Sequence, residues 1–352
     1  MDGFRWLIDI GNLPFDTAKY YRQNLKRLKE KNQLAIGNPQ SKVAFLFPGQ
    51  GSQYPGMGKD LAENFPAARK VFEEVDDALG FSISELCFDG PAETLQLTEN
   101  TQPAILSVSV AALRALEAEG VPKPDYVAGH SLGEYSALVA AGALSLTDAA
   151  RTVRARGRYM QEAVPAGQGA MAAVLGASLE TIEQACSEAR ENQVCAPANI
   201  NSPGQVVIAG DVAAVDRAID KLKQAGAKRV VKLNVSAPFH CALMMPAQQR
   251  LAADLSELRL DELSIPLISN VDAIAISKAA DARNSLIRQV SSPVRWLESM
   301  ALLLESGVEG FVEVGPGKVL SGLLRQINRE ARCLNVEDSA GVAAARAESI
   351  VS

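Results

Sequence analysis

One serine occupies a position where a chain can expose a nucleophile. The segment DYVAGHSLGEYSALVA, residues 125–140, joins a strand-like run to Gly-His-Ser-Leu-Gly and then to a helical pattern. Gly129 and Gly133 permit a tight turn, and a turn of this kind lifts the Ser131 hydroxyl out at the top of a sheet. The following helix directs unpaired N–H groups and partial positive charge at the same point. We therefore predict that Ser131 is a nucleophile, with a purely structural turn as the alternative.

A serine hydroxyl needs a base to take its proton, and the chain has only two histidines. His130 precedes the serine inside the turn, where its side chain should point away from the hydroxyl. We interpret His130 as a packed or hydrogen-bonded structural residue. His240, in the segment SAPFHCALM, is then the candidate general base, with a structural imidazole as the alternative.

The segment FPGQGSQ is the candidate for one half of an oxyanion hole. A tetrahedral intermediate needs two N–H donors, and the residue after the nucleophile, Leu132, normally supplies one. The loop follows a short apolar strand, and its glycines let the backbone approach a ligand, so Gln50 is the second candidate donor. Phosphate binding is the competing interpretation, but the loop lacks both GxGxxG spacing and a GK[ST] ending. The segment GPGKVL near the C-terminus fails the same tests and is interpreted as structural turns.

The elements that must position these residues alternate between strand and helix. Apolar runs predict strands over 42–47, 126–129, 266–271 and 310–314. Helical patterns cover 59–79, 98–120, 131–144 and 146–164, the last with Thr147 as its expected N-cap. This alternation favours an α/β fold with a mostly parallel sheet that is covered on both faces.

The regular alternation of strand and helix changes between residues 169 and 235. Strand, helix, strand, strand, helix and strand follow one another, with a serine-led helix start at Ser178. This order predicts a split βαβ, or ferredoxin-like, subdomain inserted in the larger body. The first 41 residues are different again, because a basic helix there places Tyr21, Leu25 and Leu28 on one face. We expect that helix to pack on the body, with a docking segment or a remnant of a longer or fused chain as the alternatives, and we assign it no chemistry.

Composition and charge exclude several classes of function. Of the 352 residues, 47% are hydrophobic and the net charge is -6, so nucleic acid is not an expected partner. Five scattered cysteines without a CxxC pair argue against a disulfide framework or a metal site, and favour a reducing cytosol. We see neither a secretory signal nor a run of ~20 apolar residues that could span a membrane. We expect a cytoplasmic protein.

Seven motifs, in this order, resemble one family. They are FPGQGSQ, GHSLGEYSAL, RGRYMQEAVP, GAMAAVLG, ANINSPGQVVIAG, SAPFH and VGPGKVL. Over roughly residues 42–335 the chain is similar to the malonyl-CoA:acyl carrier protein transacylases of type II fatty acid synthesis and to the acyltransferase domains of polyketide synthases. The resemblance implies an α/β-hydrolase-like body, residues 42–168 and 236–352, around a ferredoxin-like subdomain, residues 169–235, with residues 1–41 as an N-terminal helical extension.

The resemblance also implies roles for individual residues. Ser131 would be acylated with His240 as its base, and Arg156 would bind the free carboxylate of malonyl through its planar, bidentate fork. Without the motif, Arg156 would be taken for a surface charge. A main-chain carbonyl near Gln289 would orient the histidine, which gives a Ser–His dyad without a buried acid. Further substrate-binding candidates are Gln289, Phe239, Asn199, Asn201 and Met160, while the oxyanion N–H groups would come from Gln50 and Leu132.

The implied reaction is a ping-pong transfer of malonyl from malonyl-CoA, through a malonyl-serine, to the phosphopantetheine thiol of acyl carrier protein. It needs no metal or cofactor. Phe239 resembles malonyl-selective members, because its ring would fill the space of an α-methyl group, although Pro238 departs from the polyketide HAFH pattern. An acidic carrier protein would favour basic residues at the entrance, with Lys228 and Arg229 as candidates. A serine hydrolase and a non-catalytic scaffold are the rival functions, and the pathway and oligomeric state stay open, with a monomer compatible.

Overall fold

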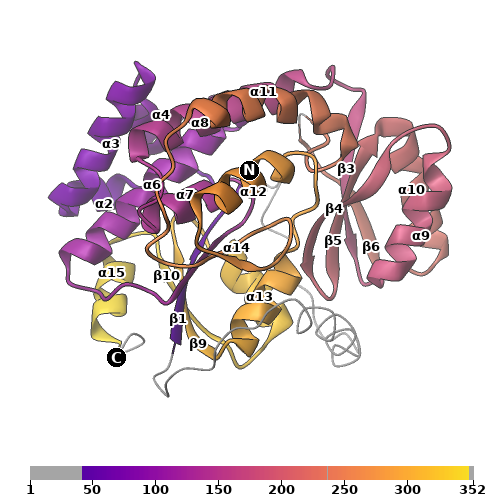
Figure 1. Ribbon diagram of the computed structural model, residues 1–352. Coiled ribbons are helices and arrows are strands. Elements are labelled where there is room, and N and C mark those ends of the chain that lie inside the picture. Colours follow the sequence, from indigo (N-terminus) through magenta and orange to yellow (C-terminus); the bar gives the residue numbers. More distant parts are fainter. Residues whose placement is uncertain (1–41, 236, 349–352) are drawn as a thin grey trace.

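The protein folds around two separate β-sheets, which lie side by side in Figure 1. The computed structural model describes residues 42–235 and 237–348, so the expected N-terminal helix lies outside the described residues. The large sheet takes its strands from both ends of the described chain, and the small sheet takes its strands from the middle. The two-sheet α/β architecture expected from the strand and helix pattern is confirmed.

The large sheet has six strands and is mostly parallel. Across the sheet they are β10 (Arg332–Val336), β9 (Val308–Val314), β1 (Lys42–Phe47), β2 (Tyr126–Gly129), β7 (Leu267–Ile268) and β8 (Ala275–Ile276). Every pairing is parallel except that of β7 with β8. Strand β1 is central, and its residues 43–47 are all buried, which explains why it reads as a continuous apolar run.

Helices cover both faces of the large sheet (Figure 1). Val43, Phe45 and Phe47 belong to one hydrophobic core, whereas Ala44 and Leu46 belong to a second core on the opposite face. The helices of this body are α2 (Lys59–Asn64), α3 (Pro66–Leu79), α4 (Ile83–Asp89), α5 (Ala92–Leu95), α6 (Thr98–Ala118), α7 (Gly133–Ala140), α8 (Leu146–Glu162), α11 (Met245–Glu257), α12 (Ala279–Gln289), α13 (Trp296–Glu305), α14 (Val319–Ile327) and α15 (Ser339–Ala347).

Two helix predictions for this body are wrong in detail. The single helix expected over 59–79 is two helices, because Phe65 is extended and Pro66, which has no N–H to donate, starts a new one. The expected N-cap Thr147 lies inside α8. Ser145 caps that helix instead, since its hydroxyl accepts from the Asp148 N–H at 3.1 Å.

The small sheet is antiparallel and contains four strands. Their order is β4 (Cys195–Ser202), β5 (Gln205–Asp211), β3 (Gly169–Leu175) and β6 (Arg229–Lys232). Helices α9 (Leu179–Arg190) and α10 (Val212–Gln224) pack against one another and against this sheet. Ser178 caps α9, as its position in the sequence predicts, by accepting from the Thr181 N–H. Strand β6 is shorter than the run KRVVKLNV suggests.

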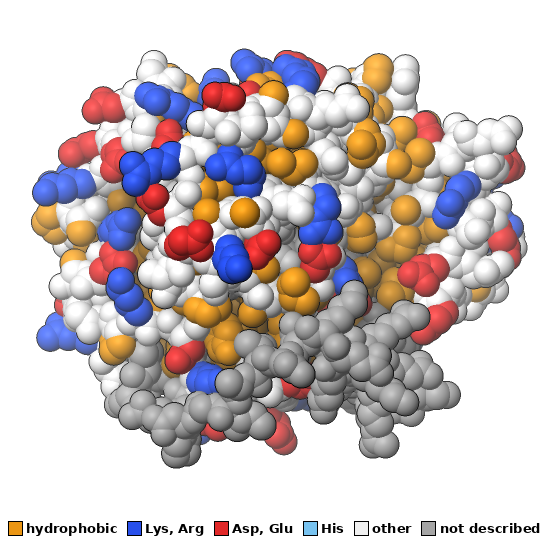
Figure 2. Space-filling model, in the orientation of Figure 1, with side chains coloured by type: hydrophobic (Ala, Val, Ile, Leu, Met, Phe, Trp, Pro, Cys, Tyr) orange, Lys and Arg blue, Asp and Glu red, His pale blue; other side chains and the backbone are white. Residues whose placement is uncertain are grey.

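The small sheet is joined to the body through the middle of β4. The Ile200 N–H donates to the Val294 carbonyl, and the Val294 N–H donates to the Ala198 carbonyl, each at 2.9 Å. Among the described residues, no helix combines the length and the apolar character needed to cross a membrane. Figure 2 shows acidic and basic side chains intermixed over the larger part of the molecule, so this face carries no continuous patch of one charge.

Candidate active site

A sharp turn between β2 and α7 presents Ser131. The backbone of this residue has φ 53°, the left-handed region that non-glycine residues rarely adopt. The flanking glycines allow the turn because a Cβ at Gly129 would lie 1.9 Å from the Gly133 carbonyl, and a Cβ at Gly133 would lie 2.1 Å from the Phe47 carbonyl oxygen. The turn thus packs directly against the end of β1 and leaves the Ser131 side chain partly exposed.

His240 faces the serine hydroxyl. Its Nε2 lies 2.8 Å from Ser131 Oγ, and its Nδ1 lies 2.9 Å from the Gln289 main-chain oxygen. Because a carbonyl can only accept, Nδ1 carries the proton and Nε2 is free to accept one from the serine. Burial, with the nearby Arg156 charge, lowers the pKa of His240 to about 3. The imidazole is therefore neutral near pH 7, as a general base must be.

Arg156 reaches the same hydroxyl from α8. The side chain is 1% exposed, and its Nη2 donates to Ser131 Oγ at 3.0 Å and to Gln289 Oε1 at 2.9 Å. Its Nη1 donates to Gln102 Oε1 at 2.6 Å. By contrast, Arg154 on the same helix lies over the Phe81 ring, 4.1 Å from its centroid. Arg156 is thus the arginine that this helix turns into the site.

The Gln50 loop abuts the turn that carries the nucleophile. The His130 N–H donates to the Phe47 carbonyl at 3.0 Å, and a Cβ at Gly49 would lie 2.4 Å from the His130 carbonyl oxygen. Gln50 therefore directly follows the residue that packs against the turn carrying Ser131. The Gln50 side chain itself is engaged elsewhere, because it donates to Thr98 Oγ1 at 3.3 Å.

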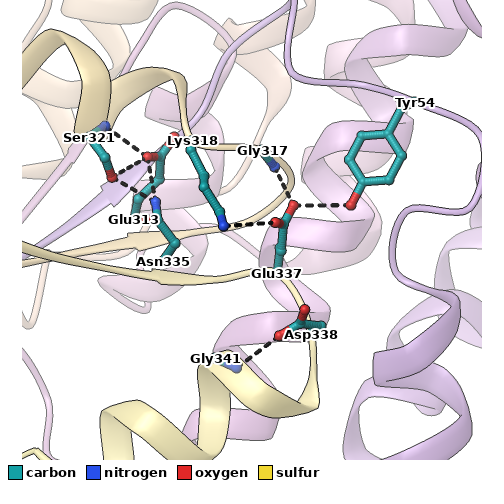
Figure 3. Close-up of polar contacts among 9 residues, drawn as sticks. All are labelled: Tyr54, Glu313, Gly317, Lys318, Ser321, Asn335, Glu337, Asp338 and Gly341. Carbon is teal, nitrogen blue, oxygen red and sulfur yellow. Dashed lines mark hydrogen bonds and ion pairs between the residues drawn. The ribbon is translucent and has the colours of Figure 1, made fainter.

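A carboxylate near the C-terminus anchors the far end of the same loop (Figure 3). Glu337 accepts from the Tyr54 hydroxyl at 3.0 Å and from the Gly317 N–H at 2.8 Å, and Lys318 Nζ lies 4.0 Å from its other oxygen. Figure 3 also shows Glu313, which is buried and accepts from Ser321 at the start of α14. The GPGKVL segment is therefore a structural turn that meets the Gln50 loop.

The remaining candidates are partly or fully buried and differ in their contacts. Asn201 contacts the site through His130, whose Nε2 lies 2.9 Å from Asn201 Oδ1, whereas Asn199 forms a bridge to Val294. Met160 is buried, with its sulfur 3.9 Å from Gln102 Nε2. Phe239 is 8% exposed and directly precedes His240.

The two basic candidates for carrier-protein docking lie away from Ser131. Gly169, at the start of β3, packs against Pro238, two residues before His240. Arg229 pairs with Leu175 at the opposite end of β3, and Lys228 packs against Gly176 there. Six residues of strand, roughly 20 Å, separate these ends. The geometry does not place Lys228 or Arg229 at the mouth of the site.

Sequence reasoning missed four polar residues around this site. They are Gln102, Glu134, Asn270 and Ser285, each at most 2% exposed. A signal was available for Glu134, which is a charged residue in a mostly apolar helix. Gln102 follows the polar residues 98–101 and gave no such signal. A buried polar side chain must find partners, so such residues indicate a hydrogen-bonded network. The expected dyad without an acid on the histidine is confirmed, because His240 Nδ1 faces the Gln289 main-chain oxygen at 2.9 Å. Glu134 is completely buried nearby, but it bonds to the Gln289 side chain and not to His240.

Comparison with known proteins agrees with this geometry. Residues 44–346 match the model of the acyl transferase domain family. The chain is 50% identical over 299 residues to the malonyl CoA-acyl carrier protein transacylase of Bacillus subtilis, covering 85% of this chain and 94% of that protein. It is 49% identical over 287 residues to the protein of the same name from Escherichia coli K12, covering 82% and 93%.

Solved structures agree with these sequence matches. An acyl carrier protein S-malonyltransferase from Vibrio cholerae has a TM-score of 0.85 at 48% identity, covering 86% of this chain and 99% of that one. A malonyl-transacylase solved in complex with its type II polyketide acyl carrier protein has a TM-score of 0.85 at 46% identity, covering 87% and 99%.

Proposed function

The chain belongs to the acyl transferase domain family, and from this membership we propose that it transfers malonyl from malonyl-CoA to the phosphopantetheine thiol of an acyl carrier protein. One observation carries the proposal. Ser131 Oγ lies 2.8 Å from the His240 imidazole and 3.0 Å from the Arg156 guanidinium. A base and a fixed cation thus meet at one hydroxyl, which suits an acyl donor whose far end is a carboxylate.

The first half-reaction acylates the serine. His240 Nε2 takes the proton as Ser131 Oγ attacks the thioester carbonyl. The N–H groups of Gln50 and Leu132 bind the oxyanion, each contributing about 3 kcal/mol or more to the transition state. As the C–S bond breaks, His240 returns its proton to the leaving thiolate of coenzyme A. Malonyl remains as an ester on Ser131.

Arg156 holds the free carboxylate of the bound malonyl. Its fork is buried, and both terminal nitrogens are fixed by side-chain amides, Gln102 on one side and Gln289 on the other. A fixed guanidinium binds a carboxylate through two parallel hydrogen bonds, which the compact ammonium of lysine cannot reproduce. This residue therefore favours malonyl over acyl groups that lack a terminal charge.

The second half-reaction reverses the chemistry with a different thiol. The phosphopantetheine thiol of the carrier protein gives its proton to His240 and attacks the ester carbonyl. The tetrahedral intermediate uses the same oxyanion donors, and the Ser131 oxygen leaves with the proton from His240. The chain's own side chains and main-chain N–H groups supply every group that these steps need, so the proposed mechanism requires no metal or cofactor.

Phe239 is proposed to limit the size of the acyl group at its α-carbon. It is buried and adjacent to His240 in the chain. An α-methyl group would compete with the phenyl ring for space, and a single methyl changes transfer by ~1–3 kcal/mol. Malonyl is therefore favoured over methylmalonyl without strict exclusion. Asn199, Asn201 and Met160 are proposed to complete the wall of the substrate site.

The two sheets support the finer fold assignment. The small sheet has the order β4-β5-β3-β6 with antiparallel neighbours, which is the arrangement of a ferredoxin-like split βαβ unit. The strand–Gly-x-Ser-x-Gly–helix turn on a mostly parallel sheet supports an α/β-hydrolase-like body. We propose residues 42–168 and 236–352 as this body, residues 169–235 as the inserted subdomain and residues 1–41 as an extension.

Incubation with malonyl-CoA that carries a label in the malonyl group tests the function. A transferase forms a labelled protein that acyl carrier protein discharges, and Ser131→Ala abolishes the label. Rapid release of free malonate would instead indicate a hydrolase, and absence of label in the wild-type protein would indicate a non-catalytic scaffold. Cys241→Ala, a buried thiol next to the catalytic histidine, serves as the matched control and should keep full labelling.

A further inference from the structure

Glu134 is a buried carboxylate that the proposed chemistry does not use. It lies in the first turn of α7, three residues after the nucleophile, and its side chain is 0% exposed. Three donors surround it: Gln289 Nε2 at 2.7 Å, the Ser285 hydroxyl at 2.9 Å and the Asn270 N–H at 3.2 Å. A buried acid with this many partners is expensive to desolvate, which calls for a reason in the structure.

Two of these partners hold the backbone of the nucleophile. Asn270 Oδ1 accepts from the Ser131 N–H at 2.7 Å, and Gln289 Nε2 donates to the Ser131 carbonyl oxygen at 2.9 Å. Asn270 also donates to the Gly129 carbonyl oxygen at 2.7 Å. Both main-chain polar groups of Ser131 are thus bound by side chains, and both of those residues are in turn bound by Glu134.

The backbone of Ser131 needs such support. A serine at φ 53° is in a sparsely populated conformation, which persists only where its surroundings fix it. We propose that Glu134 is a positioning residue for the nucleophile: through Asn270 and Gln289 it holds the Ser131 backbone in the conformation that directs Oγ at His240. The inference rests on the proposed function only for the assignment of Ser131 as nucleophile.

The same carboxylate fixes the orientation of the Gln289 amide. With Nε2 directed at Glu134, Oε1 faces Arg156 Nη2, and the main-chain oxygen of Gln289 faces His240 Nδ1. A reversed amide would place a donor against the guanidinium. Through Gln289, Glu134 is therefore linked to Ser131, to His240 and to Arg156.

Two substitutions separate hydrogen bonding from charge. In Glu134→Gln the amide oxygen can still accept from Gln289 and from the Asn270 N–H, and the amide nitrogen can donate to Ser285. In Glu134→Ala all three bonds are lost. Positioning predicts that Glu134→Gln keeps most of the activity and that Glu134→Ala loses it. Asn270→Ala removes the acceptor of the Ser131 N–H and tests the same link if Glu134→Ala does not fold.

The rate at which a fluorophosphonate modifies Ser131 is the readout, because this probe needs an activated serine but no malonyl group. At pH 8 we expect Glu134→Ala to react about 100-fold more slowly than wild type, the loss typical of a catalytic group displaced by about 1 Å. Initial rates with malonyl-CoA and acetyl-CoA should fall by the same factor in kcat, with KM little changed. A loss confined to malonyl-CoA would overturn positioning.

Glu313→Gln is the matched control. Glu313 is also 0% exposed, and burial raises the pKa of Glu313 and that of Glu134 to about 7 alike. Its partners are Leu320 and Ser321 at the start of α14 and Asn335, and Figure 3 shows the last two beside it. None of these partners is a residue that binds the Ser131 backbone, so Glu313→Gln should leave the modification rate unchanged. The inference is overturned if folded Glu134→Ala reacts at the wild-type rate. It is also overturned if Glu134→Gln reacts as slowly as Glu134→Ala. Wild-type protein that does not react overturns the Ser131 assignment and this inference with it.

Discussion

The guanidinium of Arg156 touches the nucleophile itself, with Nη2 donating to Ser131 Oγ at 3.0 Å. The same oxygen lies 2.8 Å from His240 Nε2. In the free protein the hydroxyl is therefore held between a base and a cation. We expect the carboxylate of an incoming malonyl group to replace the hydroxyl as the partner of Nη2, because a carboxylate is the stronger acceptor. Binding of a charged acyl group would then release the oxygen for attack.

Arg156→Ala should weaken malonyl transfer by about 2–5 kcal/mol in kcat/KM, the usual cost of removing one partner of a buried charge pair. Acetyl has no carboxylate, so its transfer should fall far less or even rise. The measurement is kcat/KM for malonyl-CoA and acetyl-CoA with the same protein preparation.

Arg154→Ala is the control for that experiment. Arg154 lies two residues away on the same helix but stacks on Phe81, so its removal should leave both rates intact. Equal losses of malonyl and acetyl transfer in Arg156→Ala would exclude the carboxylate-binding role.

The local parts of this site could be predicted from the sequence. The strand, the turn and the helix around Ser131 follow from apolar periodicity and from two glycines four residues apart. The same periodicity misses the break at Phe65, although Pro66 marked it.

The network behind the nucleophile could not be predicted, because its contacts join distant residues. Gln289 and Glu134 are 155 residues apart, and Asn270 and Glu134 are 136 apart. The residues around Glu134 show that a charged side chain lies in a mostly apolar helix, but only the tertiary fold shows which residues it binds. The same limit applies to Gln102, which meets Arg156 across 54 residues.

The folded protein should lose stability on acidification partly through His240. Burial and the Arg156 charge lower the pKa of this imidazole to about 3, whereas an unfolded histidine titrates near ~6.5. Below pH 6.5 the unfolded chain binds a proton that the folded protein does not. The stability that His240 contributes is therefore fully present above pH 6.5 and falls by up to about 1.4 kcal/mol per pH unit as the pH drops toward 3.

The difference in free energy of unfolding between wild type and His240→Gln isolates this effect. Burial also lowers the pKa of His130, but that residue is present in both proteins and cancels. Denaturant titrations at several pH values between 7.5 and 4.5 should show the difference changing with pH in the stated direction. A pH-independent difference would mean that His240 is not buried in its neutral form.

The turn should tolerate no side chain at Gly133. A Cβ there would meet the Phe47 carbonyl oxygen at 2.1 Å, so Gly133→Ala should lower the free energy of unfolding by about 1–3 kcal/mol or more. Gly322, inside α14, has open space around its Cβ position. Gly322→Ala should therefore be neutral or stabilise by up to about 1 kcal/mol, because alanine is the better helix former. Equal effects of the two substitutions in denaturant titrations would contradict the close packing of the Ser131 turn on β1.

Glu337 should control the rate through the Gln50 loop. It binds both Tyr54 in that loop and the Gly317 N–H (Figure 3), so Glu337→Ala frees the loop that carries an oxyanion donor. We expect a severalfold fall in kcat for malonyl-CoA and acetyl-CoA alike, because a displaced donor stabilises the oxyanion less in both reactions. Tyr54→Phe breaks one of the two bonds and should have a smaller effect in the same direction.

Glu119→Ala provides the comparison, since Glu119 follows the last residue of α6 and pairs with Arg346 of α15 at 2.8 Å. An exposed pair of this kind contributes about 0–1 kcal/mol to stability, so its loss should leave kcat unchanged. If Glu337→Ala and Glu119→Ala have the same kcat as wild type, the Gln50 loop keeps its position without Glu337. In that case the contacts at the other end of the loop, between Gly49 and the His130 carbonyl, are sufficient to hold the oxyanion donor.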